Sequence, residues 1–512
     1  MRAERLSATT TPPSRALLII VVILAIGMLI PVGYVIEATA RIGVDELATL
    51  LLRPRVGELL GNTVLILVLG VPITILLGVG SAWLVERTDL PGRRFFAILT
   101  VAPLAIPAFV SSYGWASVVP SIQGLGGGLL VATLAYYPLV YLPALATLRG
   151  LNPSLEESAR SLGLKERAVL LRVVLPQLRL AILGGGLIVA LHLLSEYGAF
   201  AFIRFDTFTT AIVVAYQSTF AGPSAASLGI VLALLSVIVL GIEATARGRA
   251  RYAYVGSGNA RPAQLVKLGK FTPLAILALV TIATLATVVP MVSVIRWSLA
   301  TKPEMLDGLW RALVDTSLLS LGGAIGAIVV ALPVAWLATR HPSRLSRVLE
   351  GGYSIASSLP AIIVALALVT VTLNVAPGLY QTAATVTAAY VIIFLPRALV
   401  TLRAGLAQVP ESLEEAARAL GTPPLLARLR VTIPLLFPAI AAAGALVALG
   451  AANELTATLL LAPTGTRTLA TQFWSAASSI DYAGAAPYAI SLVLLSIPAV
   501  ALLFAQTRGR TR

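Results

Sequence analysis

The chain has 512 residues, of which 58% are hydrophobic and only 12% are charged, and its mean hydropathy is +0.93. Apolar runs of about 20 residues recur along it, which excludes a soluble globular protein and predicts an all-α polytopic membrane protein. The formal charge of +15 does not indicate a nucleic-acid partner, because most of the 37 Lys and Arg residues fall in alternate segments between the apolar runs.

The apolar runs predict about 12 membrane-spanning helices. Arg2, Arg5 and Arg15 precede the first run as in a signal peptide, but about 20 apolar residues are too many for one, so the run is interpreted as a retained span. The basic residues then collect on one side if both termini are cytoplasmic, as the positive-inside rule requires. The spans are expected near residues 16–36, 61–84, 96–119, 125–147, 178–198, 225–245, 272–299, 315–338, 352–373, 378–401, 433–461 and 486–505.

The sequence repeats itself once. The stretch Asn62 to Thr88 matches Asp315 to His341, so that Trp83 aligns with Trp336. We therefore expect two six-helix repeats, at 1–246 and 272–512, joined by a basic cytoplasmic linker at 247–271. Six spans return the chain to its starting side, so the repeats are parallel and can form a pseudo-twofold pore.

Prolines lie inside two of the expected spans. Pro103 and Pro107 fall in the third and Pro360 in the ninth. We expect broken or kinked helices there, which packing explains as well as a gating role does.

One polar segment occurs in both repeats. "SLEESARSLGLKERAVLLRVVLP" at 154–176 and "SLEEAARALGTPPLLARLRVTIP" at 412–434 are identical at twelve of twenty-three positions. Burying their charges in a bilayer costs about 2.5–3.5 kcal/mol for each Arg, Lys or Asp at its centre, so both segments lie outside the membrane.

Each polar segment is expected to contain a short cytoplasmic helix. Ser154 with Glu157, and Ser412 with Glu415, have the spacing of a capping box. Gly163 and Gly421 are expected to end these helices. One apolar face is expected from Leu155, Ala159 and Leu162 in the first copy and from Leu413, Ala417 and Leu420 in the second, and the pairs Glu156–Arg160 and Glu414–Arg418 are expected on the wetter side.

A helix of two turns is too short to be stable alone, so its apolar face must dock. The alternatives are the protein's own loops, the lipid surface and a soluble partner. Lipid-surface helices favour basic faces with Trp or Phe, whereas these begin with two glutamates, so a groove on a partner fits better. Two copies of the helix predict a twofold partner.

These segments resemble the cytoplasmic signature of the permease subunits of ATP-binding-cassette importers. Glu157-Ser158-Ala159, Gly163 and Val173-Val174-Leu175-Pro176 match the signature, as do Glu415-Ala416-Ala417, Gly421 and Val431-Thr432-Ile433-Pro434, with Ser158 in place of an alanine. The resemblance covers essentially the whole chain and implies a MetI-like type I fold in the cell (inner) membrane. It implies that the following residues couple the permease to an ATPase: Glu156, Glu157, Ala159, Leu162, Gly163, Glu414, Glu415, Ala417, Leu420 and Gly421.

The same resemblance implies the partners. They are two copies of a cytoplasmic ATP-binding subunit, an extracellular or periplasmic substrate-binding protein and membrane lipid. No cofactor is expected on this chain, because ATP is used by the partner subunits. The fused arrangement looks most like the ferric iron permeases, on the stretches Leu194 to Tyr216 and Asn453 to Trp474, with thiamine, polyamine and phosphonate permeases as relatives.

Two other classes fit less well. A 12-span secondary transporter shares the plan of two parallel halves, but the loop "ERTDLPGRRF" lacks the spacing of the Asp-Arg-x-Gly-Arg-Arg loop in the major facilitator superfamily. An intramembrane enzyme is disfavoured because the sequence has two histidines, no HExxH and no Gly-x-Ser-x-Gly. There is no Gly-x-x-x-x-Gly-Lys-[Ser/Thr] loop either, so no catalytic residue is proposed.

Glu196 and Glu454 align between the repeats near the outer part of a span. An ionisable group there suggests a translocation path, and the alternative is a structural pair such as Glu196 with Arg204. His192 is interpreted as a hydrogen-bonded core residue rather than an iron ligand, and no metal site is expected.

Overall fold

The computed structural model describes residues 14–43, 49, 52–219, 222–247, 265–302 and 306–508. These residues form helices joined by loops, with an isolated parallel β-bridge between Thr88 and Val266. Most of the expected linker at 247–271 lies outside the described residues. The all-α class expected from hydropathy is confirmed.

The described residues contain eight helices that are long and apolar enough to cross a membrane, and as many as eleven if bent pairs count as single spans. Each of the twelve expected spans coincides with one of these, except that the ninth coincides with the shorter apolar helix α20 (Ala361–Val375). The long ones are α4 (Pro54–Arg87), α7 (Gly124–Tyr136) with α8 (Pro138–Gly150), α15 (Gly222–Arg247), α16 (Thr272–Ala283) with α17 (Val289–Ser298), α18 (Leu309–Arg340), α21 (Ala383–Leu406), α24 (Ile433–Ala452) and α27 (Tyr482–Arg508).

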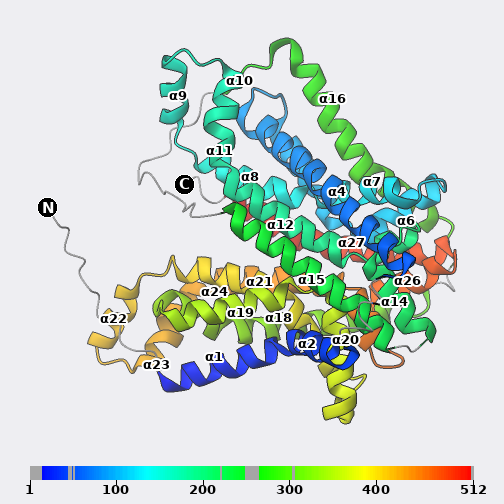
Figure 1. The fold of residues 1–512 in the computed structure, drawn as a ribbon. Coiled ribbons are helices and arrows are strands. Elements are labelled where there is room, and N and C mark those ends of the chain that lie inside the picture. Colours follow the sequence, from blue (N-terminus) through cyan, green and yellow to red (C-terminus); the bar gives the residue numbers. More distant parts are fainter. Residues whose placement is uncertain are drawn as a thin grey trace. The chain divides into compact units, whose positions relative to one another are not determined.

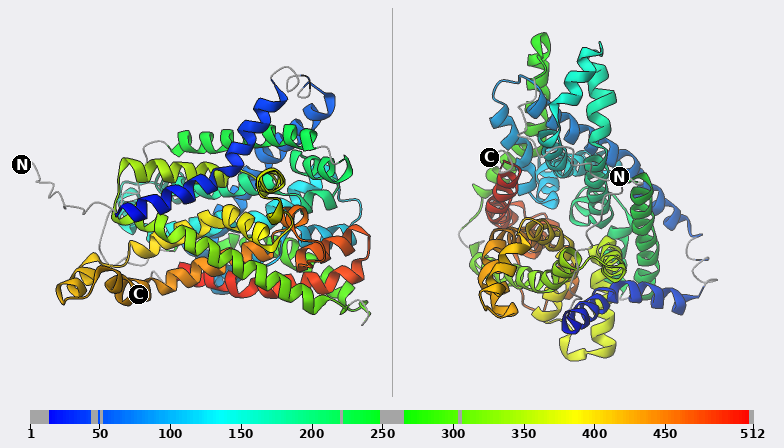
Figure 2. Two further views of the ribbon diagram at one scale, coloured as in Figure 1. Left: turned by 90° about the horizontal axis from the view of Figure 1, so that it is seen from below. Right: turned by 90° about the vertical axis from the view of Figure 1, so that its left-hand side faces the viewer.

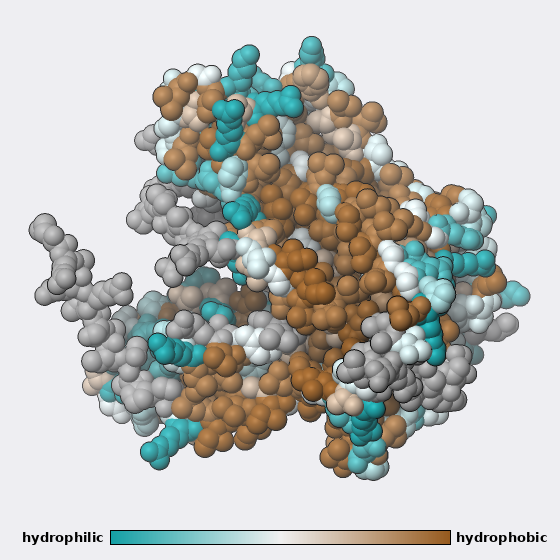
Figure 3. Space-filling model, in the orientation of Figure 1, coloured by the Kyte–Doolittle hydropathy of each residue, from teal (hydrophilic) through white to brown (hydrophobic). Residues whose placement is uncertain are grey.

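Large apolar side chains cover the outside of these helices. On α4, for example, Val68 and Leu76 are exposed. Figure 3 shows the result as a brown surface over the long helices, with hydrophilic residues gathered at their ends. An apolar surface of this extent is favourable in contact with lipid and unfavourable in contact with water.

Two of the expected spans break at the prolines named above. α5 (Arg93–Val101) and α6 (Ala108–Val118) meet at 93°, with Pro103 and Pro107 in the short 3-10 segment and loop between them. Pro360 separates α19 (Arg344–Ser358) from α20. The expected breaks are therefore confirmed. Two further pairs bend without that expectation: α1 (Arg15–Met28) with α2 (Ile30–Ile42), and α10 (Glu166–Val169) and its extension with α12 (Arg179–Ser195).

Three π turns have a common cause. η2 (Leu170–Val174), η4 (Thr284–Val288) and η7 (Arg428–Thr432) are each followed at the second residue by a proline, at Pro176, Pro290 and Pro434. A proline ring has no N–H and clashes with the carbonyl four residues earlier, so a wider turn relieves the clash. The proline of the polar segments thus shapes the entry into the following span in both repeats.

The described helices form two compact units, and the terminal helices exchange between the repeats. Unit 1 comprises the described parts of Met1–Glu37 and Val314–Thr466, and unit 2 those of Ala38–Leu313 and Arg467–Arg512. In unit 1, α1 packs against α19, where Tyr353 donates to the Val21 carbonyl at 3.1 Å. In unit 2, α17 and α27 pack with helices of the first repeat. The first span of each sequence repeat thus packs with the other repeat's helices (Figure 1).

Small residues allow the spans within each unit to approach closely. A side chain at Gly78 of α4 would lie 2.8 Å from the Tyr137 carbonyl, and one at Gly405 of α21 would lie 2.3 Å from the Ala439 Cβ. Lipid supplies little hydrophobic force between helices, so this close van der Waals packing stabilises the units.

Short helices complete both units. In unit 2 these are α9 (Pro153–Ser161), α11 (Leu175–Gln177), α13 (Gly198–Phe202), α14 (Phe208–Thr219) and α26 (Leu469–Ser478). In unit 1 they are α22 (Glu411–Ala419), α23 (Pro424–Ala427) and α25 (Thr456–Leu461). In the left-hand view of Figure 2, the gold and orange segment with α22 and α23 extends beyond the ends of α21 and α24.

Candidate functional site

The first polar segment forms α9 at one end of unit 2 (Figure 1). The helix begins at Pro153, two residues earlier than a cap at Ser154 would give, and the Asn152 side chain caps it by accepting the Ser154 N–H at 3.0 Å. The expected capping box of Ser154 and Glu157 is therefore wrong. Proline suits the first helical position because its missing N–H would have no helical partner there, and this places the cap at Asn152.

The second polar segment forms α22, at one end of unit 1. It begins at Glu411, and Pro410, which has no side-chain acceptor, occupies the N-cap position. The expected capping box of Ser412 and Glu415 is also wrong, since Ser412 is already inside the helix. The acidic side chains of Glu411 and Glu414 in the first turn favour this helix start through the helix dipole.

Both helices end as expected, at glycines in the left-handed conformation. Gly163 has φ +84° and Gly421 has φ +86°. The N–H of Leu164 bonds to the Ala159 carbonyl at 3.1 Å, and that of Thr422 bonds to the Ala417 carbonyl at 3.1 Å. This pattern is the Schellman motif, for which glycine is the favoured residue.

The leucines of both helices point outward. Leu162 is 83% exposed and Leu420 is 88% exposed, and Leu155 and Leu413 are exposed as well. The expectation of one uniform face is wrong at Ala159, which is buried. Ala159 lies three residues after Glu156 and shares the side of the helix that faces the protein.

Glu156 is on the inside rather than on the expected wetter side. Its carboxylate lies 3.1 Å from Nη1 of Arg87, the last residue of α4, and both side chains are almost fully buried, at 7% and 4% exposure. It also lies 3.5 Å from Arg160, so the expected i,i+4 pair does form. Glu157, the next residue, is exposed. A step of one residue on a helix turns a side chain by about 100°, which separates the two glutamates.

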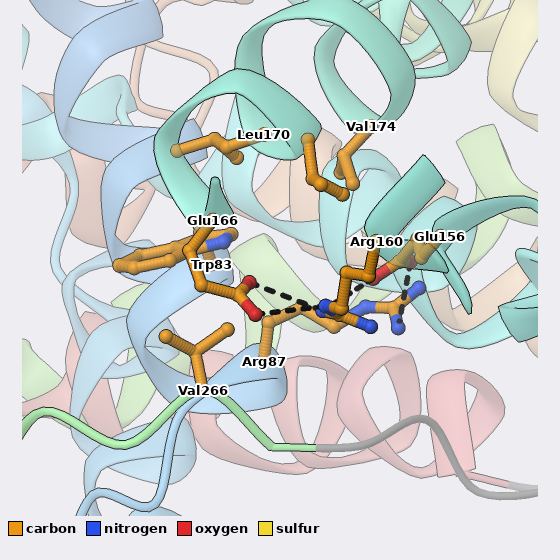
Figure 4. Close-up of a pocket in the computed structure, with 9 residues that line it drawn as sticks. Trp83, Arg87, Glu156, Arg160, Glu166, Leu170, Val174 and Val266 are labelled. Atoms are coloured by element: carbon orange, nitrogen blue, oxygen red, sulfur yellow. Dashed lines mark hydrogen bonds and ion pairs between the residues drawn. The ribbon is translucent and has the colours of Figure 1, made fainter. Parts of the chain in front are cut away.

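The buried pair is part of a chain of charges on three helices, α4, α9 and α10 (Figure 4). Arg87 donates to the Leu148 carbonyl of α8 at 2.9 Å. At the other end, Arg160 binds both carboxylate oxygens of Glu166 in α10, at 2.8 and 3.1 Å. These hydrogen bonds raise the pKa of the Arg160 guanidinium above its usual range. The charges line a small pocket, which also includes Trp83, Glu166, Val169, Leu170, Val174 and Val266.

The last residues of the expected linker are tied to the same place. The Val266 N–H bonds to the Arg87 carbonyl at 2.8 Å, and the Asp89 N–H bonds to the Val266 carbonyl at 3.2 Å. The Asp89 side chain accepts the Leu268 N–H at 2.8 Å. The end of α4 thus holds α9 and the last residues of the linker together.

Unit 1 has a different arrangement at the equivalent residues. Arg340, which aligns with Arg87, pairs with Glu411 at 2.7 Å, and Glu411 is 60% exposed. Glu414, which aligns with Glu156, pairs with Arg428 at 3.2 Å and accepts from Thr432 at 3.2 Å. The expected pair of Glu414 with Arg418 is therefore replaced by one with Arg428. Trp336 lies under the guanidinium groups of both Arg340 and Arg428.

Glu196 and Glu454 occupy matching positions in their units. Glu196 accepts the Ala199 N–H at 2.8 Å, in the first turn of α13, and Glu454 accepts the Ala457 N–H at 2.9 Å, in the first turn of α25. Glu196 also accepts a hydrogen bond from the Tyr136 hydroxyl. Both carboxylates therefore bind a helix start just after a span has ended, an arrangement that the helix dipole favours.

The described residues contain no group of three or more His, Asp or Glu side chains that could hold a metal ion. His192 Nδ1 lies 2.8 Å from the Ile188 carbonyl, and its ring packs against Tyr136 at 5.2 Å between centroids. The expected hydrogen bond of His192 is therefore confirmed, but the side chain is only half-buried, so the expectation of a core position is wrong.

Three residues with roles in these contacts were not predicted from the sequence: Arg87, Asn152 and Tyr136. A signal existed for the first, because Arg87 and Arg340 align between the repeats at the C-terminal ends of equivalent spans. Asn-Pro before an acidic turn was a signal for the cap at Asn152. Nothing in the local sequence pointed to Tyr136, because its partner Glu196 is sixty residues away.

Comparison with known proteins gives matches to both repeats. A family described as "Binding-protein-dependent transport system inner membrane component" matches residues 47–251 and again 323–510. The chain is 35% identical over 482 residues to the Fe(3+)-transport system permease protein FbpB 2 of Haemophilus influenzae, covering 93% of this chain and 95% of that protein.

More distant relatives match in whole or in part. The ferric transport system permease protein FbpB of Actinobacillus pleuropneumoniae is 21% identical, over 85% of this chain and 69% of its own length. The sulfate transport system permease protein CysW of Synechocystis is 28% identical over 35% of this chain and 72% of its own length.

Proposed function

The chain belongs to the family of binding-protein-dependent transport system inner membrane components, and from that premise we propose that it forms the translocation pathway of a ferric iron importer. Members of this family are membrane-spanning permeases rather than enzymes, and they work with ATPase and substrate-binding subunits. The observation that carries the choice of ferric iron is the similarity to an Fe(3+)-transport permease over nearly the full length of both chains.

The substrate is tested by reconstitution. The purified permease, its ATPase and its binding protein are placed in liposomes, and uptake of radioactive iron from the Fe³⁺-loaded binding protein is measured. We expect ATP-dependent uptake of iron and none of sulfate, thiamine, polyamine or phosphonate. Uptake of one of these instead of iron would contradict the choice of substrate.

We also propose that α9 and α22 dock on two copies of a cytoplasmic ATPase subunit, which hydrolyses the ATP. Each helix, together with its C-cap residue, presents exposed leucines beside an exposed glutamate: Leu155, Glu157 and the C-cap Leu162 for α9, and Leu413, Glu415 and the C-cap Leu420 for α22. Exposed leucine side chains next to a charged residue are suited to binding in a groove on a soluble protein. Two such helices, one in each repeat, support a stoichiometry of two ATPase subunits.

The orientation follows from the same proposal. α9 and α22 must lie in the cytoplasm, and so must both termini. The concentration of basic residues in the segments that contain these helices supports this orientation through the positive-inside rule.

Glu196 and Glu454 remain our candidates for the translocation path. Hard carboxylate oxygens suit a hard cation in transit, and a weak site lets it leave. Their hydrogen bonds to the starts of α13 and α25 support a second, structural role. Substitutions that remove only the charge, or both the charge and the hydrogen bond, separate the role in translocation from the structural role.

A further inference from the structure

The end of α4 is joined to α9 through one buried side chain. The Arg87 guanidinium contacts the Glu156 carboxylate at 3.1 Å and the Leu148 carbonyl at 2.9 Å, and so links α4, α9 and α8. Since α4 is a continuous helix of 34 residues, Arg87 lies at the end of a membrane-spanning element. A displacement of α9 is therefore applied directly to a membrane-spanning helix.

Because the contact between Arg87 and Glu156 is buried, it resists separation. Separating the two charges would leave the Arg87 guanidinium in a site with little water and without the carboxylate that it contacts, which is unfavourable. Arg160 supports Glu156 from the other side at 3.5 Å and is itself held by Glu166. We expect α9 and the end of α4 to move together rather than slide past each other.

The equivalent joint in unit 1 is more open to water. Arg340 contacts α22 through Glu411, which is 60% exposed, and Glu414 is held by Arg428, which is 43% exposed. Water competes for exposed ion pairs, so they hold two elements together weakly. The two copies of the polar segment therefore differ in stiffness although their sequences are similar.

We propose that Arg87 and Glu156 are positioning residues that transmit the movement of α9 into α4. As a consequence, movement of α9 drives transport more strongly than movement of α22. The inference rests on the proposed docking of α9 and α22 on ATPase subunits. It adds that the inner glutamate, Glu156, carries the motion, whereas the outer one, Glu157, faces the partner.

The test compares matched variants, Glu156→Gln in unit 2 and Glu411→Gln in unit 1. Each is reconstituted with the ATPase and the iron-loaded binding protein, and the number of ions transported per ATP hydrolysed is measured together with co-purification of the ATPase. For Glu156→Gln we expect transport per ATP to fall about tenfold with co-purification unchanged, and for Glu411→Gln a change of less than about twofold. Arg87→Glu should have the same effect as Glu156→Gln, and the exchanged pair Arg87→Glu/Glu156→Arg should restore part of the loss.

Equal ratios for the two Gln variants, or an unchanged ratio for Glu156→Gln, would overturn the inference. If Glu156→Gln does not accumulate in the membrane, Arg87→Lys decides instead, because lysine keeps the charge but cannot reach both Glu156 and the Leu148 carbonyl in the same geometry. A lowered ratio in Arg87→Lys then supports the inference, and a normal ratio rejects it. Failure of the unaltered permease to bind any ATPase would count against the proposed function rather than against this joint.

Discussion

Adjacent glutamates in the polar segments have different environments. In α9, Glu156 is buried against Arg87, while Glu157 is exposed beside Leu155 and Leu162. Because neighbouring residues on a helix point about 100° apart, one charge can stabilise the helix on its own protein while the other remains available to a partner. Glu156 and Glu157 should therefore be substituted one at a time rather than together.

Glu196 and Glu454 can be tested with two kinds of substitution. Glutamine removes the charge but keeps an oxygen that accepts the N–H of Ala199 or Ala457, whereas alanine removes both. We expect Glu196→Gln/Glu454→Gln to lower iron uptake several-fold with an unchanged thermal unfolding temperature. The matching double alanine variant should also lose stability, by about 0.5–2 kcal/mol for each lost helix-start hydrogen bond.

Uptake and thermal unfolding in detergent are measured on the same preparations. Normal uptake by the Gln variant would leave these carboxylates with the structural role alone. A large drop in unfolding temperature in the Gln variant would instead show that the charge itself is needed for folding.

At the scale of the helix, a few residues with particular backbone properties determine where a helix begins and ends. α9 ends at Gly163 in the left-handed conformation and begins at the Asn152–Pro153 pair. The proline two residues after each of the three π turns widens the helix before the following segment. These local rules act equally in both repeats, so α9 and α22 have the same length although their caps differ.

The cap at Asn152 gives a test at this scale. Asn152→Ala removes the acceptor of the Ser154 N–H and should weaken the first turn of α9 by about 0.5–2 kcal/mol. Hydrogen–deuterium exchange should accordingly become several-fold faster in α9. Ser154→Ala is the matched control, and we expect it to leave exchange nearly unchanged. The opposite ranking of the two variants would restore Ser154 as the cap.

At the scale of the whole molecule, the sequence repeats and the compact units divide the chain differently. α1 packs with helices of the second repeat and α17 with helices of the first. Each unit consequently contains helices from both repeats, and each carries one of the two short outward-facing helices, α9 or α22. The proposed docking on α9 and α22 therefore requires both repeats.

Docking is tested with Glu157→Lys/Glu415→Lys. Both side chains are exposed, so the reversal should not disturb insertion or folding. A repelled or misaligned partner should abolish substrate-stimulated ATP hydrolysis, which is measured in proteoliposomes. Normal stimulation in the double variant would contradict the assignment of these two residues to the docking surface.

Orientation is tested by labelling, since the chain contains no cysteine. A cysteine at Leu162 should react with a membrane-impermeant thiol reagent only in inside-out vesicles. One at Leu379, in the loop before α21, should react only in right-side-out vesicles, and both side chains are exposed. The reverse pattern would invert the topology.

The sequence by itself determined the class, the spans, the repeat and the position of the short helices. Apolar runs long enough to cross a bilayer, prolines that break helices and glycines that end them act through local physics, so Pro107 and Gly163 could be interpreted without coordinates. Only the tertiary structure decided the partners of Glu156 and Glu196 and the exchange of α1 and α17 between repeats. Arg87 lies sixty-nine residues before Glu156, and Tyr136 lies sixty residues before Glu196, so these contacts depend on which helices pack together. Helix packing follows from the combined shapes of many side chains, and no periodicity along one segment records it.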